Sequence, residues 1–189
     1  MRVVTWNLNG IRAAHRKGLD DFIEKIDADI MLFQEVRALP EQMPKDWSEP
    51  EGYELIWHPA DKKGYSGVMS CSRIEMKEIE RGIDTDLDGT RDPEGRVLVT
   101  KHGNLSCINM YLPNGSSRQE RQDYKDQWLE DMLDWKRNKR PAAQVYGGLC
   151  SAPFHFKHFD EVLADIGAAK KTRPNPLAEQ FSYPNAEAF

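Results

Sequence analysis

The chain has 189 residues, enough for one substantial domain, and its 39% hydrophobic and 30% charged residues are typical of a soluble globular protein rather than a disordered or fibrous one. No apolar run approaches the roughly 20 residues that cross a bilayer, and the start MRVVTWNLNG lacks the features of a signal peptide. A net charge of -5 excludes a protein that coats nucleic acid wholesale, but it allows a local basic groove beside metal-binding carboxylates.

Cysteine usage predicts a reducing compartment. The chain has three cysteines, Cys71, Cys107 and Cys150, and no C-x-x-C pair. This odd count disfavours a disulfide framework or a structural zinc site. We therefore expect a cytoplasmic protein without a membrane partner.

The first half of the chain alternates strand, helix and strand. Residues 2–8 (RVVTWNL) are β-branched and apolar, and they end at an Asn-Gly turn signal. Apolar residues then recur at helical spacing over 19–26, and the apolar run 29–33 predicts a buried strand. Residues 38–52 carry three prolines and are predicted to form a loop.

Strands dominate the middle of the chain. The four candidates are residues 53–57, 67–72, 96–101 and 105–111. An acidic, turn-rich segment, 84–95, lies between the second and third of them.

The longest predicted helix covers residues 118–139. Tyr124, Trp128, Met132 and Trp135 form one apolar stripe along it, and cations at its end oppose the helix dipole. A strand at 144–147 and a helix at 157–166 are predicted to follow.

Three polar residues stand at or just after the ends of predicted strands: Asn7, Glu35 and Tyr111. Strand ends are where sheet proteins commonly build sites, and a carboxylate beside an amide can hold Mg²⁺. Each residue also has an ordinary explanation, as a turn former, a surface charge and a core ring respectively. The pattern alone leaves both interpretations open.

Five local sequences occur in a characteristic order and spacing. They are TWNLNGIRA at 5–13, LFQEVR at 32–37, YSGV at 65–68, EGR at 94–96 and MYLPNGSSRQERQDYK at 110–125. Together they resemble the exonuclease III and AP endonuclease family, within the endonuclease/exonuclease/phosphatase superfamily. The resemblance covers roughly the first 145 residues.

The resemblance implies a fold and an activity. Family members are α/β proteins in which two facing sheets carry helices on their outer sides, a four-layer sandwich. They cleave double-stranded DNA beside abasic sites and remove nucleotides from 3′ ends, using Mg²⁺ with Mn²⁺ as a substitute. The preference among abasic endonuclease, 3′ exonuclease and 3′ phosphatase work stays open, because it depends on loop shape.

The resemblance also implies site residues. Asn7 and Glu35 fall on the family's first metal-site positions, with Glu35 as the direct ligand, and Tyr111 falls on the tyrosine that contacts the scissile phosphate. Metal and hydrogen-bond donors aimed at phosphate oxygens lower the barrier to hydrolysis. The residues that fall in loops near DNA in the family are Arg12, Lys62, Lys63, Tyr65, Asn114, Gly115 and Arg118.

The family's G-D-x-N motif is altered in this chain. Gly148 stands at the position of the aspartate that activates water, and Cys150 at that of the asparagine. Glycine cannot accept a proton, and a thiol is a poor substitute for an amide. We therefore expect weak or absent catalysis.

The family pattern is also shortened after Pro153, and the chain stops at Phe189 without the terminal S-D-H motif. We expect residues 1–189 to form one domain that resembles a C-terminally truncated family member. Its second sheet should be incomplete, and unpaired strand edges predict low stability or self-association.

Three functional hypotheses follow. The first is a DNA-repair phosphodiesterase of the exonuclease III type. The second is a catalytically dead remnant that binds DNA or metal through the retained loops. The third is a truncated product that has no function alone or is completed by another chain.

Overall fold

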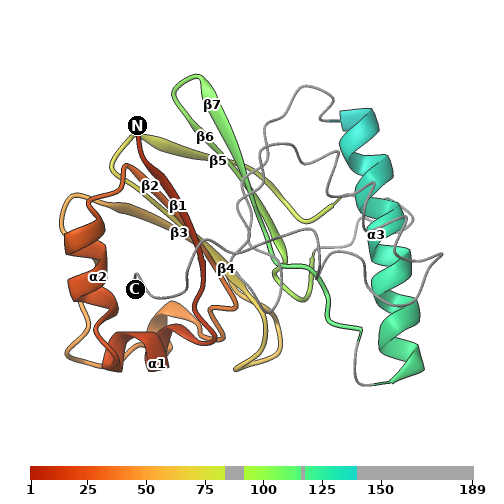
Figure 1. Cartoon of the computed structure of the whole chain (residues 1–189), viewed down its shortest axis with the longest axis horizontal. Helices are drawn as coiled ribbons and strands as arrows, with labels where there is room; N and C mark the ends of the chain where they lie inside the picture. The colour runs from red at the N-terminus through yellow and green to blue at the C-terminus, as the bar shows by residue number, and fades with distance from the viewer. Residues whose placement is uncertain (84–91, 116–117, 140–189) are drawn as a thin grey trace, which may run out of the picture. The chain divides into compact units, whose positions relative to one another are not determined.

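Two β-sheets face each other, with helices on their outer sides (Figure 1). The structure is a computed structural model that describes residues 1–83, 92–115 and 118–139. The strand expected at 144–147 and the helix expected at 157–166 lie outside these residues, as do Gly148 and Cys150.

The first sheet has four strands in the order β1-β2-β4-β3. Strands β1 and β2 are parallel, whereas β4 runs antiparallel to both of its neighbours. The strands are β1 (Val3–Asn7), β2 (Ile30–Gln34), β3 (Glu54–His58) and β4 (Val68–Ser72). A short 3₁₀ turn, η1 (Pro40–Gln42), lies in the segment that was expected to be a loop.

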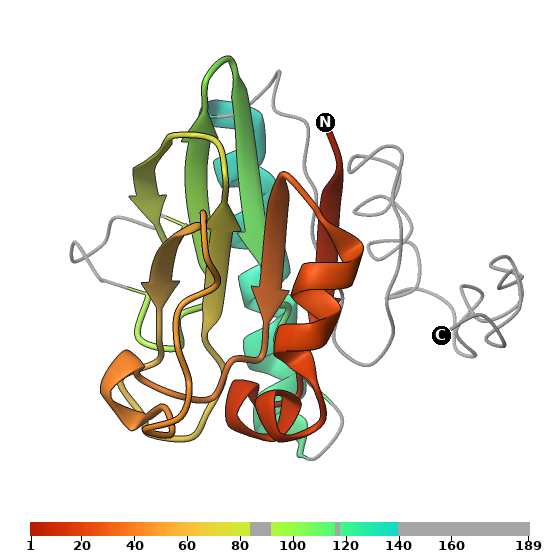
Figure 2. The same ribbon diagram turned by 90° about the vertical axis from the view of Figure 1, so that its left-hand side faces the viewer.

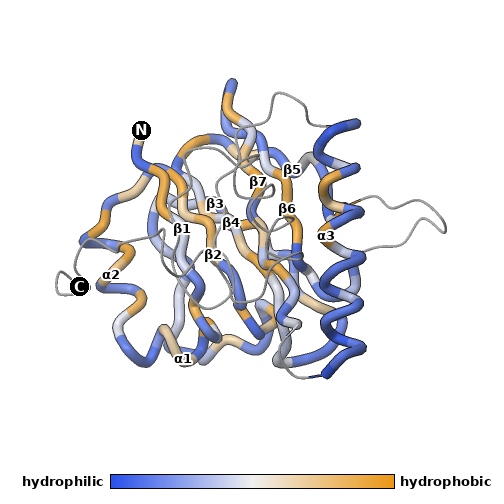
Figure 3. The backbone as a smooth tube through the Cα atoms, turned by 45° about the vertical axis from the view of Figure 1, so that its right-hand side comes forward, coloured by the Kyte–Doolittle hydropathy of each residue, from blue (hydrophilic) through white to orange (hydrophobic). Residues whose placement is uncertain are grey.

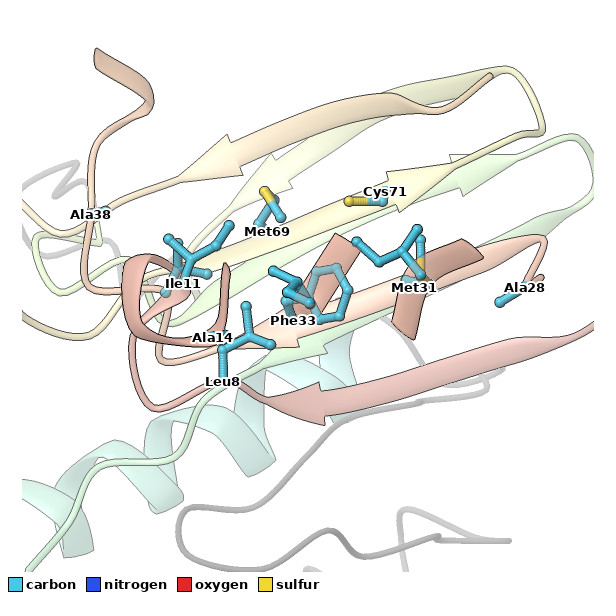
Figure 4. Packing of buried hydrophobic residues seen from close by; sticks show 12 residues of the cluster. Leu8, Ile11, Ala14, Ala28, Met31, Phe33, Ala38, Met69 and Cys71 are labelled. Atoms are coloured by element: carbon cyan, nitrogen blue, oxygen red, sulfur yellow. The ribbon is translucent and has the colours of Figure 1, made fainter. Parts of the chain in front are cut away.

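Helices α1 (Ile11–Arg16) and α2 (Leu19–Ile26) cover the outer face of this sheet (Figure 2). Met31 and Phe33 point toward them and share a buried cluster with Ile11 (Figure 4). Ile30 and Leu32, on the other face of β2, pack with Cys107 of the second sheet. Strand β2 is covered on both faces, and this explains its continuous apolar sequence.

The second sheet is antiparallel, with the order β5-β6-β7. Its strands are β5 (Met76–Arg81), β6 (Val97–His102) and β7 (Leu105–Met110). Helix α3 (Gln119–Lys139) flanks it (Figure 1).

Helix α3 is mostly hydrophilic, with a narrow apolar stripe (Figure 3). Trp128, Met132 and Trp135 of the expected stripe are buried, and Leu129 joins them. The Trp135 indole also donates a hydrogen bond to the Glu80 carboxylate of β5, at 2.8 Å. This bond satisfies the polar end of a buried ring and ties the helix to the edge strand.

A buried amide pair joins the two sheets. Gln34 and Asn109 are both fully buried, and Gln34 Nε2 donates to Asn109 Oδ1 at 2.8 Å. Asn109 Nδ2 donates in turn to the backbone carbonyl of Met69 at 2.9 Å and that of Phe33 at 3.2 Å. One side chain of β7 therefore bonds to both β2 and β4.

The sequence-based expectations hold for the fold class and for most elements. The two-sheet α/β sandwich with outer helices is confirmed. Helix α1 was not expected from the sequence. It has only six residues, of which two are buried, and so short a segment shows no clear helical spacing of apolar residues. Strand β5 was missed because its sequence, MKEIER, is mostly charged. It is an edge strand with an irregular register against β6, so its side chains need not be apolar.

No helix in the described part of the chain is long and apolar enough to cross a membrane.

Replacing Asn109 with Leu tests the contact between the sheets. The variant removes the bond from the Gln34 amide to Asn109 and those from Asn109 to two backbone carbonyl groups, so we expect a loss of about 1–3 kcal/mol in the free energy of unfolding. Urea denaturation measures this loss. Lys101→Ala, an exposed change on β6, is the control, and a similar small effect of both variants would contradict the assigned role.

Candidate active site

Asn7 and Glu35 lie at the same edge of the first sheet. Strands β1 and β2 are parallel, and Asn7 is in register with Gln34, the residue before Glu35. Asn7 Oδ1 accepts a hydrogen bond from the Asn9 backbone at 2.9 Å, as expected of a turn former. The amide is thereby oriented at the strand end from which the Glu35 carboxylate also projects.

The backbone on either side of Val36 adopts an uncommon conformation. Glu35 and Arg37 both have positive φ, at 56° and 53°, which is costly for residues with a Cβ. Two loops hold the segment in place with four backbone hydrogen bonds. These run from Gly10 to Glu35, Ile11 to Val36, Val36 to Gly67 and Arg37 to Ser66, at 2.8–3.0 Å.

The Glu35 side chain is largely buried and paired with an arginine. Glu35 is 8% exposed, and its Oε1 accepts a hydrogen bond from Nη2 of Arg37. The Arg37 side chain itself is 43% exposed. The carboxylate is therefore fixed by the fold, whereas its partner has room to move into solvent.

Tyr111 reaches the same edge from the second sheet. It follows β7 two residues after Asn109, which contacts Gln34. The Tyr111 ring is 7% exposed and packs with Val68, the β4 residue opposite Gln34. The structure therefore brings the three strand-end residues to one end of the two sheets.

A buried arginine holds Tyr111 in position. Arg96 is 1% exposed, and its Nη1 donates to the Tyr111 carbonyl at 3.0 Å while the guanidinium lies 5.0 Å from the ring centroid. The Tyr111 backbone N–H also donates to the Arg96 carbonyl at 2.8 Å. Arg96 thus fixes the position of both the backbone and the ring of Tyr111.

The charge of Arg96 is balanced by Glu94. The pair is 2.6 Å apart, from Nε to Oε2. Arg121 of α3 approaches the other Glu94 oxygen at 3.3 Å, and both arginines donate to the Tyr65 hydroxyl, at 3.2 and 3.0 Å. This network, defined by Tyr65, Glu94, Arg96, Tyr111 and Arg121, joins α3 to the candidate site.

The network determines the ionisation of Glu94. Burial acts to raise the pKa of Glu94, but the charges and hydrogen bonds of Arg96 and Arg121 outweigh it and the net shift is downward. The pKa of nearby Tyr124 rises to about 12, because burial and the Glu94 charge both disfavour a phenolate. Glu94 is therefore a stably charged structural carboxylate rather than a proton donor.

Two glycines permit the close packing around the network. A Cβ on Gly95 would lie 2.5 Å from the His58 carbonyl oxygen and 2.7 Å from the carbonyl carbon of Pro59. A Cβ on Gly67 would lie 3.4 Å from Pro59. Both residues also have positive φ. The glycines of the EGR and YSGV sequences therefore allow their loops to pack closely against the backbone of His58 and Pro59.

The residues expected near DNA differ in their surroundings. Tyr65 is part of the buried network, and the exposed Lys62 lies with its Nζ 5.3 Å from the Tyr65 ring centroid. Arg12 is an exposed residue of α1, and Lys63 is exposed in the loop before Tyr65. Asn114 and Arg118 are exposed between β7 and α3, and Gly115 beside them is half-buried.

The donor set around Glu35 is compatible with a hard divalent cation. Mg²⁺ is commonly bound by one or two carboxylates and keeps several waters. Glu35 supplies one fixed carboxylate, and Asn7 supplies an amide oxygen at the same sheet edge. Within the described ranges no group of three or more His, Cys, Asp or Glu could hold a metal. The residues fit an open, partly hydrated site rather than a closed cage.

The roles of Arg37, Arg96 and Arg121 could not be predicted from the sequence. Arg37 and Arg96 lie within the quoted sequences LFQEVR and EGR, but nothing in the sequence pairs them with particular carboxylates. The contact between the sheets did leave a sign in the sequence. Asn109 is a polar residue that interrupts the apolar strand sequence CINMY, and a buried polar residue needs a partner.

Comparison with known proteins gives a family match over most of the described chain. The model of the endonuclease/exonuclease/phosphatase family matches residues 4–147. An exodeoxyribonuclease from Bacillus subtilis is 36% identical over 137 residues, which cover 71% of this chain and 52% of that protein. A DNA-(apurinic or apyrimidinic site) endonuclease from Dictyostelium discoideum is 31% identical over 98% of this chain and 50% of its own.

Solved structures share the fold. An AP endonuclease from Archaeoglobus fulgidus superposes with a TM-score of 0.65 at 24% identity, covering 78% of this chain and 56% of that one. A 3′-5′ exonuclease from Neisseria meningitidis gives 0.66 at 23% identity, covering 79% and 57%. The chain thus spans about half the length of the curated relatives reported above.

Removing the Glu94 charge should change how stability depends on pH. The folded-state pKa of Glu94 lies below its ordinary value of 4.5. Its contribution is therefore present above that value and is lost as the pH falls through the lower folded-state pKa. We expect Glu94→Gln to lower the melting temperature at pH 7 and to flatten its decline in acid.

Melting temperatures measured from pH 3 to pH 7 test this expectation. Glu51→Gln, at an exposed loop position, is the matched control and should leave the profile of the unmodified chain unchanged. Parallel acid profiles for Glu94→Gln and the unmodified chain would contradict the assigned role of Glu94.

Proposed function

Because the chain belongs to the endonuclease/exonuclease/phosphatase family, we propose that it is a DNA-repair phosphodiesterase of the exonuclease III type. Its substrate would be double-stranded DNA with abasic sites or 3′ ends. The observation that carries the proposal is the placement of Glu35 and Tyr111, from different sheets, at one end of the sandwich.

Glu35 would hold the divalent metal, Mg²⁺ or its substitute Mn²⁺, with Asn7 beside it. The metal, when bound, supplies a positive charge for the phosphate oxygens on which negative charge develops. Glu35 is suited to this role because four backbone hydrogen bonds fix the segment that carries it. Such preorganisation spares the protein the cost of reorganising during the reaction.

Tyr111 would face the scissile phosphate. Arg96 fixes its backbone and ring, and the pair of Arg96 with Glu94 balances the buried charge. We assign Arg12, Lys62, Asn114 and Arg118 to the DNA backbone, because all four are exposed polar groups. Phosphate contacts of this kind position a duplex without reading its sequence.

A second candidate function is DNA binding without incision. Gly148 and Cys150 stand where the family has the aspartate that activates water and its asparagine partner. Loss of groups that act as a unit lowers rates by orders of magnitude without abolishing binding. The phosphate-facing residues are separate from this pair in sequence and would remain.

Three further features of the proposal concern the whole chain. Residues 1–189 would act as one domain in the cytoplasm, where Cys71 and Cys107, both buried and free, stay reduced. Two chains would associate through β7, beside which the described residues place no further strand.

Incision of an abasic duplex tests the proposed function. The purified chain is incubated with a duplex that carries one abasic site, with Mg²⁺ and then with a chelator. We expect slow, Mg²⁺-dependent incision that Glu35→Ala abolishes and Tyr111→Phe lowers by about 10²–10³-fold, as for other transition-state hydrogen-bond donors. Arg73→Gln is the control, because Arg73 follows β4 at the opposite end of the first sheet from Glu35.

Binding of the same duplex, measured by fluorescence anisotropy in chelator, separates the two candidate functions. Binding without incision would support the second. An absence of both binding and incision would overturn both candidate functions. Incision that persists in Glu35→Ala would overturn the second candidate and the role assigned to Glu35.

A further inference from the structure

Arg37 pairs with the carboxylate that the proposed function assigns to the metal. The pair joins Arg37 Nη2 to Glu35 Oε1, so the guanidinium stands where a cation bound by that oxygen would have to approach. A guanidinium this close to the carboxylate would also repel a divalent cation bound to its other oxygen, Oε2, because both cations would lie within a few ångströms of each other.

The arginine side chain is the part of this pair that can move most easily. The segment from Glu35 to Arg37 is held on both sides by loop hydrogen bonds at 2.8–3.0 Å, and both of these residues have positive φ. The Glu35 side chain is 11% exposed, compared with 43% for Arg37. A rotamer change at Arg37 is therefore the least costly way to free the carboxylate.

The Arg37 stem already has a surface to lie on. A Cβ built on Gly10 would be 3.8 Å from Arg37 Cδ, so the methylene chain passes over the glycine of the Asn-Gly turn. The guanidinium can thus turn outward while the stem stays packed.

We infer that Arg37 sets the metal affinity of the site by competing with the cation for Glu35. In the absence of metal the guanidinium neutralises a largely buried carboxylate. Binding of a metal breaks this pair. The free energy lost with the pair therefore weakens the observed binding of the metal. The inference rests on the proposed function in taking Glu35 as the metal ligand.

Binding of Mn²⁺ to the full chain, measured by calorimetry without DNA, tests the inference. Removing the guanidinium removes both its pairing with Glu35 and its repulsion of the cation, although the exposed side of the pair keeps the effect modest. We therefore expect Arg37→Gln to bind Mn²⁺ about two- to tenfold more tightly than the unmodified chain. Arg37→Lys keeps the charge but loses the planar fork, so its affinity should fall between the two.

Arg73→Gln is the matched control, because Arg73 also forms a partly exposed pair, with Asp27, and its side chain is 38% exposed. It should leave Mn²⁺ affinity unchanged. Equal or weaker binding by Arg37→Gln would overturn the inference, as would an equal gain in Arg73→Gln. If Arg37→Gln does not fold, Arg37→Lys must still bind more tightly than the unmodified chain.

The same titration separates failure of the inference from failure of the proposed function. Glu35→Gln should lose the site in every background. If neither the unmodified chain nor any Arg37 variant binds Mn²⁺ through Glu35, the proposed metal site is wrong, and so is the inference that depends on it. Binding through Glu35 that ignores Arg37 overturns the inference alone.

Discussion

The hydrogen bond between Gln34 and Asn109 joins the two sheets at the end where the candidate site forms. Each partner lies one or two positions before a site residue, because Glu35 follows Gln34 and Tyr111 follows Asn109 by two residues. A purely apolar contact would allow the sheets to slide, whereas this amide pair also bonds to carbonyls of β2 and β4. The relative placement of Glu35 and Tyr111 depends on it.

Two ion-pair systems belong to the candidate site, and they are constrained in different ways. Around Tyr111, Glu94 and Arg96 form a buried pair that Arg121 supports from α3, and it is suited to hold a ring still. Around Glu35, the backbone is fixed but the arginine partner is half in solvent. The pair of Glu94 and Arg96 is a permanent part of the fold. In the pair of Glu35 and Arg37, we propose, the arginine can give way to a cation.

Much of the fold could be predicted from the sequence, because apolar periodicity is imposed by burial. Strand β2 is buried on both faces, and its sequence is continuously apolar. Helix α3 is buried along a narrow stripe, and its apolar residues recur at helical spacing. Strand β5 was missed because an edge strand tolerates charge. The local sequences singled out Asn7, Glu35 and Tyr111 as candidates, and the structure places all three at one end of the two sheets. The pairs of Arg37 with Glu35 and of Arg96 with Glu94 and Tyr111 could not, because they depend on left-handed backbone and on loops from distant parts of the chain.

We propose that Glu35 and Tyr111 form one metal-dependent phosphate site. Anomalous diffraction from crystals grown with Mn²⁺ tests it most directly. We expect a single strong peak at coordination distance from the Glu35 carboxylate, about 2.0–2.1 Å as for Mg²⁺, with Tyr111 facing it and the Arg37 side chain turned outward. A peak elsewhere with the pair of Glu35 and Arg37 intact, or no peak, would contradict it.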